Sequence, residues 1–156
     1  MVHLVYDGDH EQKSFALRAN DATITSLAPV EAPPRKIRGL TTLLMWGHGN
    51  QGSICHMDSR ALYRYLRAWK YKNKSLSVIE LLTCDARHYW NDPNSQGSDR
   101  HTHSVVDGLR PLMRRPLSPL KNVTLKALPM SRHGSSQAAS ILLTQTNDGT
   151  WAYISA

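Results

Sequence analysis

Two apolar runs on either side of an amphipathic segment constrain the fold of this chain most strongly. Residues 40–46 (LTTLLMW) and 76–83 (LSVIELLT) are short and almost continuously apolar, which is typical of strands buried on both faces of a parallel sheet. Between them, Asp58 is a suitable N-cap for a helix that extends to about Lys70. The order strand, helix, strand therefore predicts a right-handed βαβ unit.

The predicted helix has one apolar face and one basic face. We expect its apolar face to enter the core and its basic face to remain in solvent. The apolar side chains are Ala61, Leu62, Tyr65, Leu66 and Trp69, and the basic ones are Arg60, Arg64 and Arg67.

The remaining elements have shorter signals. We expect strands at 2–6, 22–28 and 123–128 and a helix at 104–113, and Asn147-Asp148-Gly149 predicts a hairpin turn between strands 140–145 and 151–154. The expected fold is α/β: a three-layer sandwich around a mostly parallel sheet with an antiparallel edge hairpin. A length of 156 residues with 40% hydrophobic residues favours a single domain over 1–156.

Composition excludes some classes of protein and leaves others open. No apolar run approaches the roughly 18 residues of a membrane span, and the first ten residues predict no secretory signal. Two cysteines are too few for a disulfide scaffold, which favours a reducing compartment such as the cytoplasm. The net charge of +7 suits an anionic partner: nucleic acid, a membrane surface or a small polyanion. A merely solvated basic surface is the alternative.

Two chemically reactive residues follow the two strong strands. His48 lies in Gly47-His48-Gly49 after the first strand, and Cys84 follows the second. Ligands of open α/β sheets bind at the carboxyl ends of the strands, so we expect both side chains at one edge. There an imidazole can ionise the thiol, and the backbone N–H groups of Gly49 and Cys84 can form an oxyanion hole.

Each residue also has an ordinary structural explanation. A cysteine that closes a buried strand is usually a small hydrophobic side chain, and a His-Gly pair is often only a turn. The placement of both residues at the ends of consecutive parallel strands favours the catalytic interpretation.

The segments Leu43–Gly49 and Glu80–Asp85 resemble the caspase-like (clan CD) cysteine peptidases, in which an apolar strand ends in His-Gly and a later one ends in the nucleophilic cysteine. The resemblance covers about residues 40–87. It implies a caspase-like sandwich and a cysteine endopeptidase with Cys84 as nucleophile, His48 as catalytic histidine and Gly49 as oxyanion-hole amide. In this family the histidine mainly protonates the leaving amine.

The resemblance is nearest to the self-processing protease domains of bacterial toxins and effectors, which act in a host cytosol without a classical secretion signal. In that branch, inositol hexakisphosphate bound to Lys and Arg activates the enzyme, and Lys70, Lys72 and Lys74 are our candidate polyanion ligands. Two alternatives remain open. One is a Cys-His acyltransferase or deamidase, and the other is a non-catalytic module that binds a polyanion or a protein.

Other functional motifs are weak or missing. Cys55-His56 and His101-x-His103 lack the spacing of a zinc site, so we predict no metal. The sequence has no GxGxxG, no Walker loop and no GxSxG elbow. We therefore expect no required cofactor, no sequence-specific nucleic acid and a protein or peptide substrate.

Overall fold

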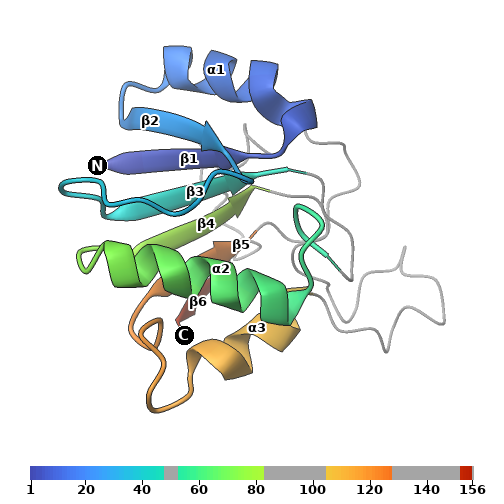
Figure 1. Ribbon diagram of the computed structural model, residues 1–156, viewed down its shortest axis with the longest axis vertical. Helices are drawn as coiled ribbons and strands as arrows, with labels where there is room; N and C mark the ends of the chain where they lie inside the picture. The colour runs from blue at the N-terminus through green and yellow to red at the C-terminus, as the bar shows by residue number, and fades with distance from the viewer. Residues whose placement is uncertain (48–52, 83–104, 128–151, 156) are drawn as a thin grey trace, which may run out of the picture.

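The protein is built around one six-stranded sheet (Figure 1). The computed structural model describes residues 1–47, 53–82, 105–127 and 152–155. Five strands are parallel, and the sixth pairs antiparallel with the fifth. Across the sheet the order is β2 (Ile24–Pro29), β1 (Val2–Tyr6), β3 (Thr42–Trp46), β4 (Val78–Leu82), β5 (Thr124–Ala127) and β6 (Ala152–Ser155).

Alternating residues of the strands form two separate apolar clusters. Leu4 and Leu44 pack with Leu17 of α1 (Glu11–Asn20) on one face. The other cluster contains Val5 and Met45, together with buried residues of α2 (Ser59–Lys72) and α3 (Val105–Met113). The described helices therefore cover opposite faces of the sheet, with α1 on one side and α2 and α3 on the other (Figure 1).

The central βαβ unit forms as the sequence predicts. Asp58 is the N-cap of α2, and its side chain accepts a hydrogen bond from the Ala61 N–H at 2.8 Å. Leu62, Leu66 and Trp69 are buried as expected. Tyr63 is also buried, although the helical pattern did not predict this. Its hydroxyl donates to Ser118 Oγ, in the loop after α3, at 3.0 Å.

Most predicted elements are confirmed within a few residues. The prediction missed α1 because its apolar face is narrow. Of the α1 residues whose burial is described, only Ser14 and Leu17 are buried. The edge strand β6 is present and pairs with β5. Its expected hairpin partner, 140–145, lies outside the described residues.

The two ends of the strands have different surroundings. The amino ends of β1, β3, β4 and β5 meet at one edge, where Thr42 N–H donates to Met1 O at 3.2 Å and Thr124 N–H to Ser77 O at 2.8 Å. The carboxyl ends lie at the opposite edge, which is where the sequence predicts the candidate site (Figure 1). Within the described part of the chain, no helix has the length and apolar character needed to cross a membrane.

Candidate functional site

The strands that precede the two predicted catalytic residues are direct neighbours. β3 and β4 pair in parallel, and their last residues, Trp46 and Leu82, are register partners. His48 follows Trp46 by two residues, and Cys84 follows Leu82 by two. His48, Gly49 and Cys84 themselves lie outside the described residues. The supporting strands thus have the arrangement that the sequence analysis required.

The same edge contains the point at which the strand order reverses. The chain passes from β1 outward to β2, then returns to β3 on the other side of β1 and continues through β4 to β5. In sheets of this kind, the crevice at the reversal point is where ligands bind. Here the reversal point lies between the carboxyl ends of β1 and β3, where Asp7 N–H donates to Trp46 O at 3.0 Å.

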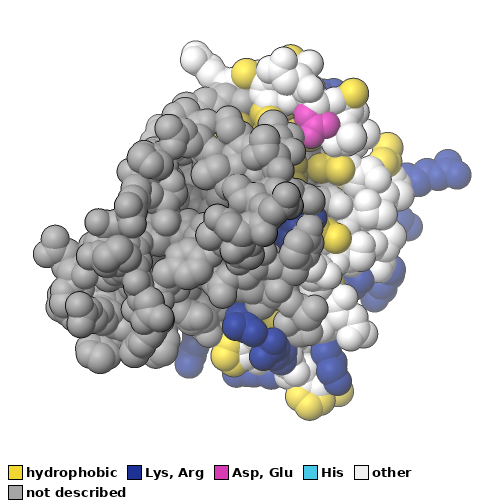
Figure 2. Space-filling model, turned by 180° about the vertical axis from the view of Figure 1, so that it is seen from behind, with side chains coloured by type: hydrophobic (Ala, Val, Ile, Leu, Met, Phe, Trp, Pro, Cys, Tyr) yellow, Lys and Arg dark blue, Asp and Glu magenta, His cyan; other side chains and the backbone are white. Residues whose placement is uncertain are grey.

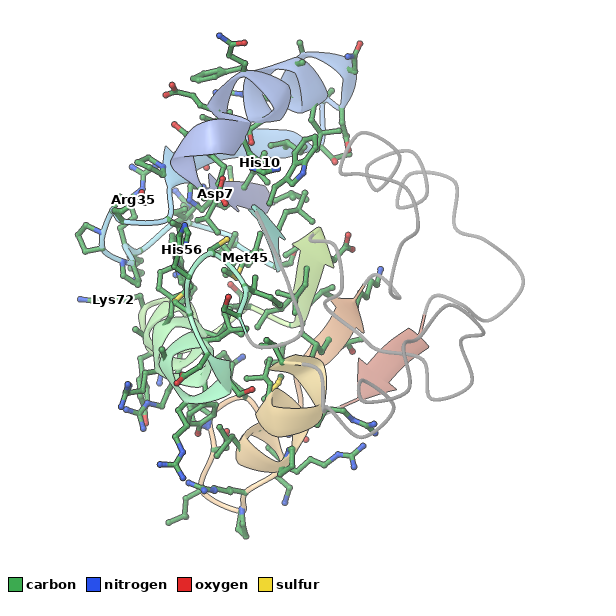
Figure 3. All side chains as sticks on the ribbon, turned by 90° about the vertical axis from the view of Figure 1, so that its right-hand side faces the viewer. Asp7, His10, Arg35, Met45, His56 and Lys72 are labelled. Atoms are coloured by element: carbon green, nitrogen blue, oxygen red, sulfur yellow. The ribbon has the colours of Figure 1, made fainter. Side chains whose placement is uncertain are left out.

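A buried carboxylate–imidazole pair occupies this position. Asp7 directly follows β1, and its Oδ1 lies 2.7 Å from Nδ1 of His10. Both side chains are buried, and the His10 ring packs against the Trp46 ring with centroids 5.9 Å apart. Figure 3 shows the two residues together at this edge. A carboxylate on one imidazole nitrogen holds the ring in a defined orientation.

Gly47 is required at the end of β3 because the space beside its Cα is filled. A Cβ at this position would lie within 3.0 Å of both Cys55 Sγ and a carboxylate oxygen of Asp7. Asp7 and Cys55 thus pack against the residue that immediately precedes His48. Gly47, the first residue of the motif Gly47-His48-Gly49, therefore contacts a buried side-chain cluster formed by Asp7, His10 and Cys55.

A tight turn holds Cys55 in this cluster. Ile54 and Met57 form an antiparallel bridge, with N–H···O distances of 2.8 and 2.9 Å in the two directions. The two residues between them have left-handed backbones, with φ of 48° at Cys55 and 63° at His56. This conformation costs a non-glycine residue roughly 1–2 kcal/mol, and such strain is common near functional sites.

The thiol of Cys55 is poorly suited to nucleophilic attack. Burial, together with the nearby carboxylates of Asp7 and Glu31, raises the pKa of Cys55 to about 12. The thiol is therefore protonated at neutral pH, and the thiolate is the reactive form. Cys55 therefore has the environment of a structural residue.

Replacing His56 with glycine is expected to stabilise the fold. Glycine adopts φ near 63° without the steric cost, and His56 is exposed, so the free energy of unfolding should rise by about 0.5–1 kcal/mol in urea denaturation. His56→Val should lower it, since a β-branched side chain is least tolerated there. Equal stability of all three proteins would contradict strain in this turn.

The three lysines predicted to bind a polyanion have different surroundings. Lys70 Nζ donates to Lys74 O at 2.7 Å and to Leu76 O at 2.6 Å, and so satisfies carbonyls beyond the end of α2. Partial burial, with the charge of Lys74, lowers the pKa of Lys70. Lys74 Nζ lies 5.7 Å from the Tyr71 ring centroid, and Lys72 is exposed. Lys70 thus has a structural role that its sequence position did not reveal.

The sequence analysis did not identify Asp7 and His10 as site residues. Asp7 directly follows the strand expected at 2–6, and an acidic residue at the carboxyl end of a parallel strand is a usable signal. Cys55 was considered only as a zinc ligand. Among the described residues, no group of three or more His, Cys, Asp or Glu side chains is arranged to hold a metal ion.

No protein-family description, curated protein or solved structure matches this chain.

Proposed function

We propose that the chain is a cysteine endopeptidase with a caspase-like three-layer fold and a Cys84–His48 dyad. The observation that carries the proposal is the parallel pairing of β3 and β4 with Trp46 opposite Leu82. His48 and Cys84 each lie two positions after the last residue of their strand, so both follow paired strand ends by the same number of residues. The position of β3 beside the reversal point of the strand order adds support, because ligands of such sheets bind there.

The proposed reaction proceeds through an acyl-enzyme. The Cys84 thiolate attacks the scissile carbonyl carbon, and the N–H groups of Gly49 and Cys84 stabilise the resulting oxyanion. His48 gives a proton to the departing amine as the C–N bond breaks. Water then attacks the thioester carbonyl, and cleavage of the C–S bond releases the carboxylic acid and regenerates the Cys84 thiol.

The described cluster has a positioning role in this proposal. Asp7 and Cys55 pack against Gly47, the residue next to His48, and His10 holds the Asp7 carboxylate in place. The high pKa of Cys55 leaves Cys84 as the nucleophile of the two thiols. Under the same proposal, 140–145 completes the antiparallel edge hairpin, and inositol hexakisphosphate acts as an activator.

Intact-mass analysis with peptide acyloxymethyl ketones tests the proposal. Probes with Asp, Arg, Leu or Ala at P1 are incubated with the protein, with and without inositol hexakisphosphate. We expect one adduct on the wild type and on Cys55→Ala, and none on Cys84→Ala. His48→Ala should lower peptide hydrolysis by about 10²–10⁴-fold, the usual contribution of a general acid.

Each outcome has a distinct meaning. An adduct on Cys84→Ala, or one lost in Cys55→Ala, would overturn the assignment of the nucleophile. Adduct formation without hydrolysis of any peptide would favour transfer to another acceptor or deamidation. No labelling with any probe would remove the peptidase proposal and favour a binding module.

A further inference from the structure

We propose that the end of the molecule opposite the candidate site docks on an anionic lipid bilayer. Three segments separated in sequence meet there: 32–41 before β3, 70–77 at the end of α2, and 114–123 between α3 and β5. We call this surface the basic end. None of the three segments contains an Asp or Glu. Its exposed cations include Lys36, Arg38, Lys72, Lys74, Arg115 and Lys121.

Hydrogen bonds join the three segments into one surface. The buried Asn73 links the first two, because its Nδ2 donates to Arg35 O at 2.9 Å and its Oδ1 accepts from Ile37 N–H at 2.8 Å. Thr124, directly after the third segment, donates its N–H to the carbonyl oxygen of Ser77, the last residue of the second segment, at 2.8 Å. In Figure 2, Lys and Arg side chains gather along the right-hand and lower rim, which corresponds to the left-hand and lower rim of Figure 1. The positive charge is thus spread over a broad face.

Two of these segments also carry an exposed large apolar side chain. Leu117 is 96% exposed and follows Arg114-Arg115-Pro116, and Tyr71 is 55% exposed between Lys70 and Lys72. Peripheral membrane proteins combine these features, because apolar tips enter the interface while Lys and Arg contact anionic headgroups. A nucleic acid or a small soluble polyanion makes no use of a projecting leucine. The combination therefore favours a bilayer.

The geometry of the fold determines how the protein would face the bilayer. The basic end is formed at the amino ends of the strands, where Ser75 Oγ donates to Leu40 O at 2.6 Å. The cluster of Asp7, His10 and Cys55 is at their carboxyl ends. Docking through the basic end therefore leaves the candidate site facing away from the lipid.

Vesicle co-sedimentation tests this proposal on the full chain carrying Cys84→Ala, so that the result does not depend on peptidase activity. We expect binding to phosphatidylcholine vesicles with about 30% phosphatidylserine, little binding to phosphatidylcholine alone, and weakening at high salt. Each Lys or Arg near such a surface contributes about five-fold, so Lys36→Ala/Lys72→Ala should weaken binding about 25-fold. Leu117→Ser should weaken it about ten-fold.

Arg60→Ala/Arg64→Ala is the matched control. It removes the same charge from exposed positions in the first half of α2, near its other end, and should change binding less than three-fold. Equal loss in both double variants, no effect of Leu117→Ser, or no binding to anionic vesicles would overturn the proposal. Binding of inositol hexakisphosphate or duplex DNA that needs Lys36 and Lys72, without vesicle binding, would assign the surface to a soluble polyanion instead.

Discussion

Gly47→Ala is expected to lower the free energy of unfolding by about 3 kcal/mol and to slow Cys84 labelling by at least about 100-fold. The added methyl would lie within 3.0 Å of Cys55 Sγ and a carboxylate oxygen of Asp7. Both neighbours are buried, and overpacking of such a site costs about 1–3 kcal/mol or more. His48 is the next residue, so displacement at Gly47 should also disturb the proposed dyad. Urea denaturation and labelling rates measure the two effects.

Gly8→Ala provides the matched control, because a Cβ at Gly8 would have no atom within 4 Å. Its free energy of unfolding should stay within about 0.5 kcal/mol of the wild type. Adding Cys55→Ala to Gly47→Ala removes one of the two clashes and should restore part of the lost stability. Equal free energies of unfolding for Gly47→Ala and Gly8→Ala would contradict the close packing at the end of β3.

The stability of the protein is expected to fall by about 3 kcal/mol between pH 7.5 and pH 4 through His3 alone. His3 is buried in β1, where its Nδ1 lies 2.8 Å from Ser26 Oγ and its ring packs against Trp69. Burial, and secondarily the charge of Arg35, lowers the pKa of His3 from 6.5 to about 4. Between these two values the unfolded chain binds more protons, so stability is lost as the pH falls through this window.

His3→Gln isolates this contribution because glutamine keeps a polar group and does not titrate. Urea denaturation of both proteins at several pH values should show their difference in unfolding free energy shrinking by about 3 kcal/mol from pH 7.5 to pH 4. A constant difference between wild type and His3→Gln would show that His3 is not held neutral by burial.

Much of the sheet could be predicted because its central strands are short, nearly continuous apolar runs, which are typical of strands buried on both faces of a parallel sheet. β1 and β3 have apolar side chains on both faces, β4 places Ile79 and Leu81 in the larger cluster, and Asp58 marks the start of α2. Helix α1 was missed because only a narrow stripe of it is buried. The burial of Tyr63 depends on Ser118, a partner 55 residues away, which helical periodicity cannot reveal.

The candidate site divides in the same way. Sequence pattern by itself determined which residues follow the two central strands, because strand ends are visible as changes in local composition. It thereby identified His48 and Cys84 as the catalytic candidates. Only the tertiary structure decided that Asp7 and Cys55 meet at Gly47 and that His10 pairs with Asp7. It also decided that Lys70 satisfies carbonyls beyond the helix end and that three distant basic segments share one surface. Such groupings depend on strand order and on the crossing connections, because these decide which loops become neighbours, and local sequence contains no signal for either.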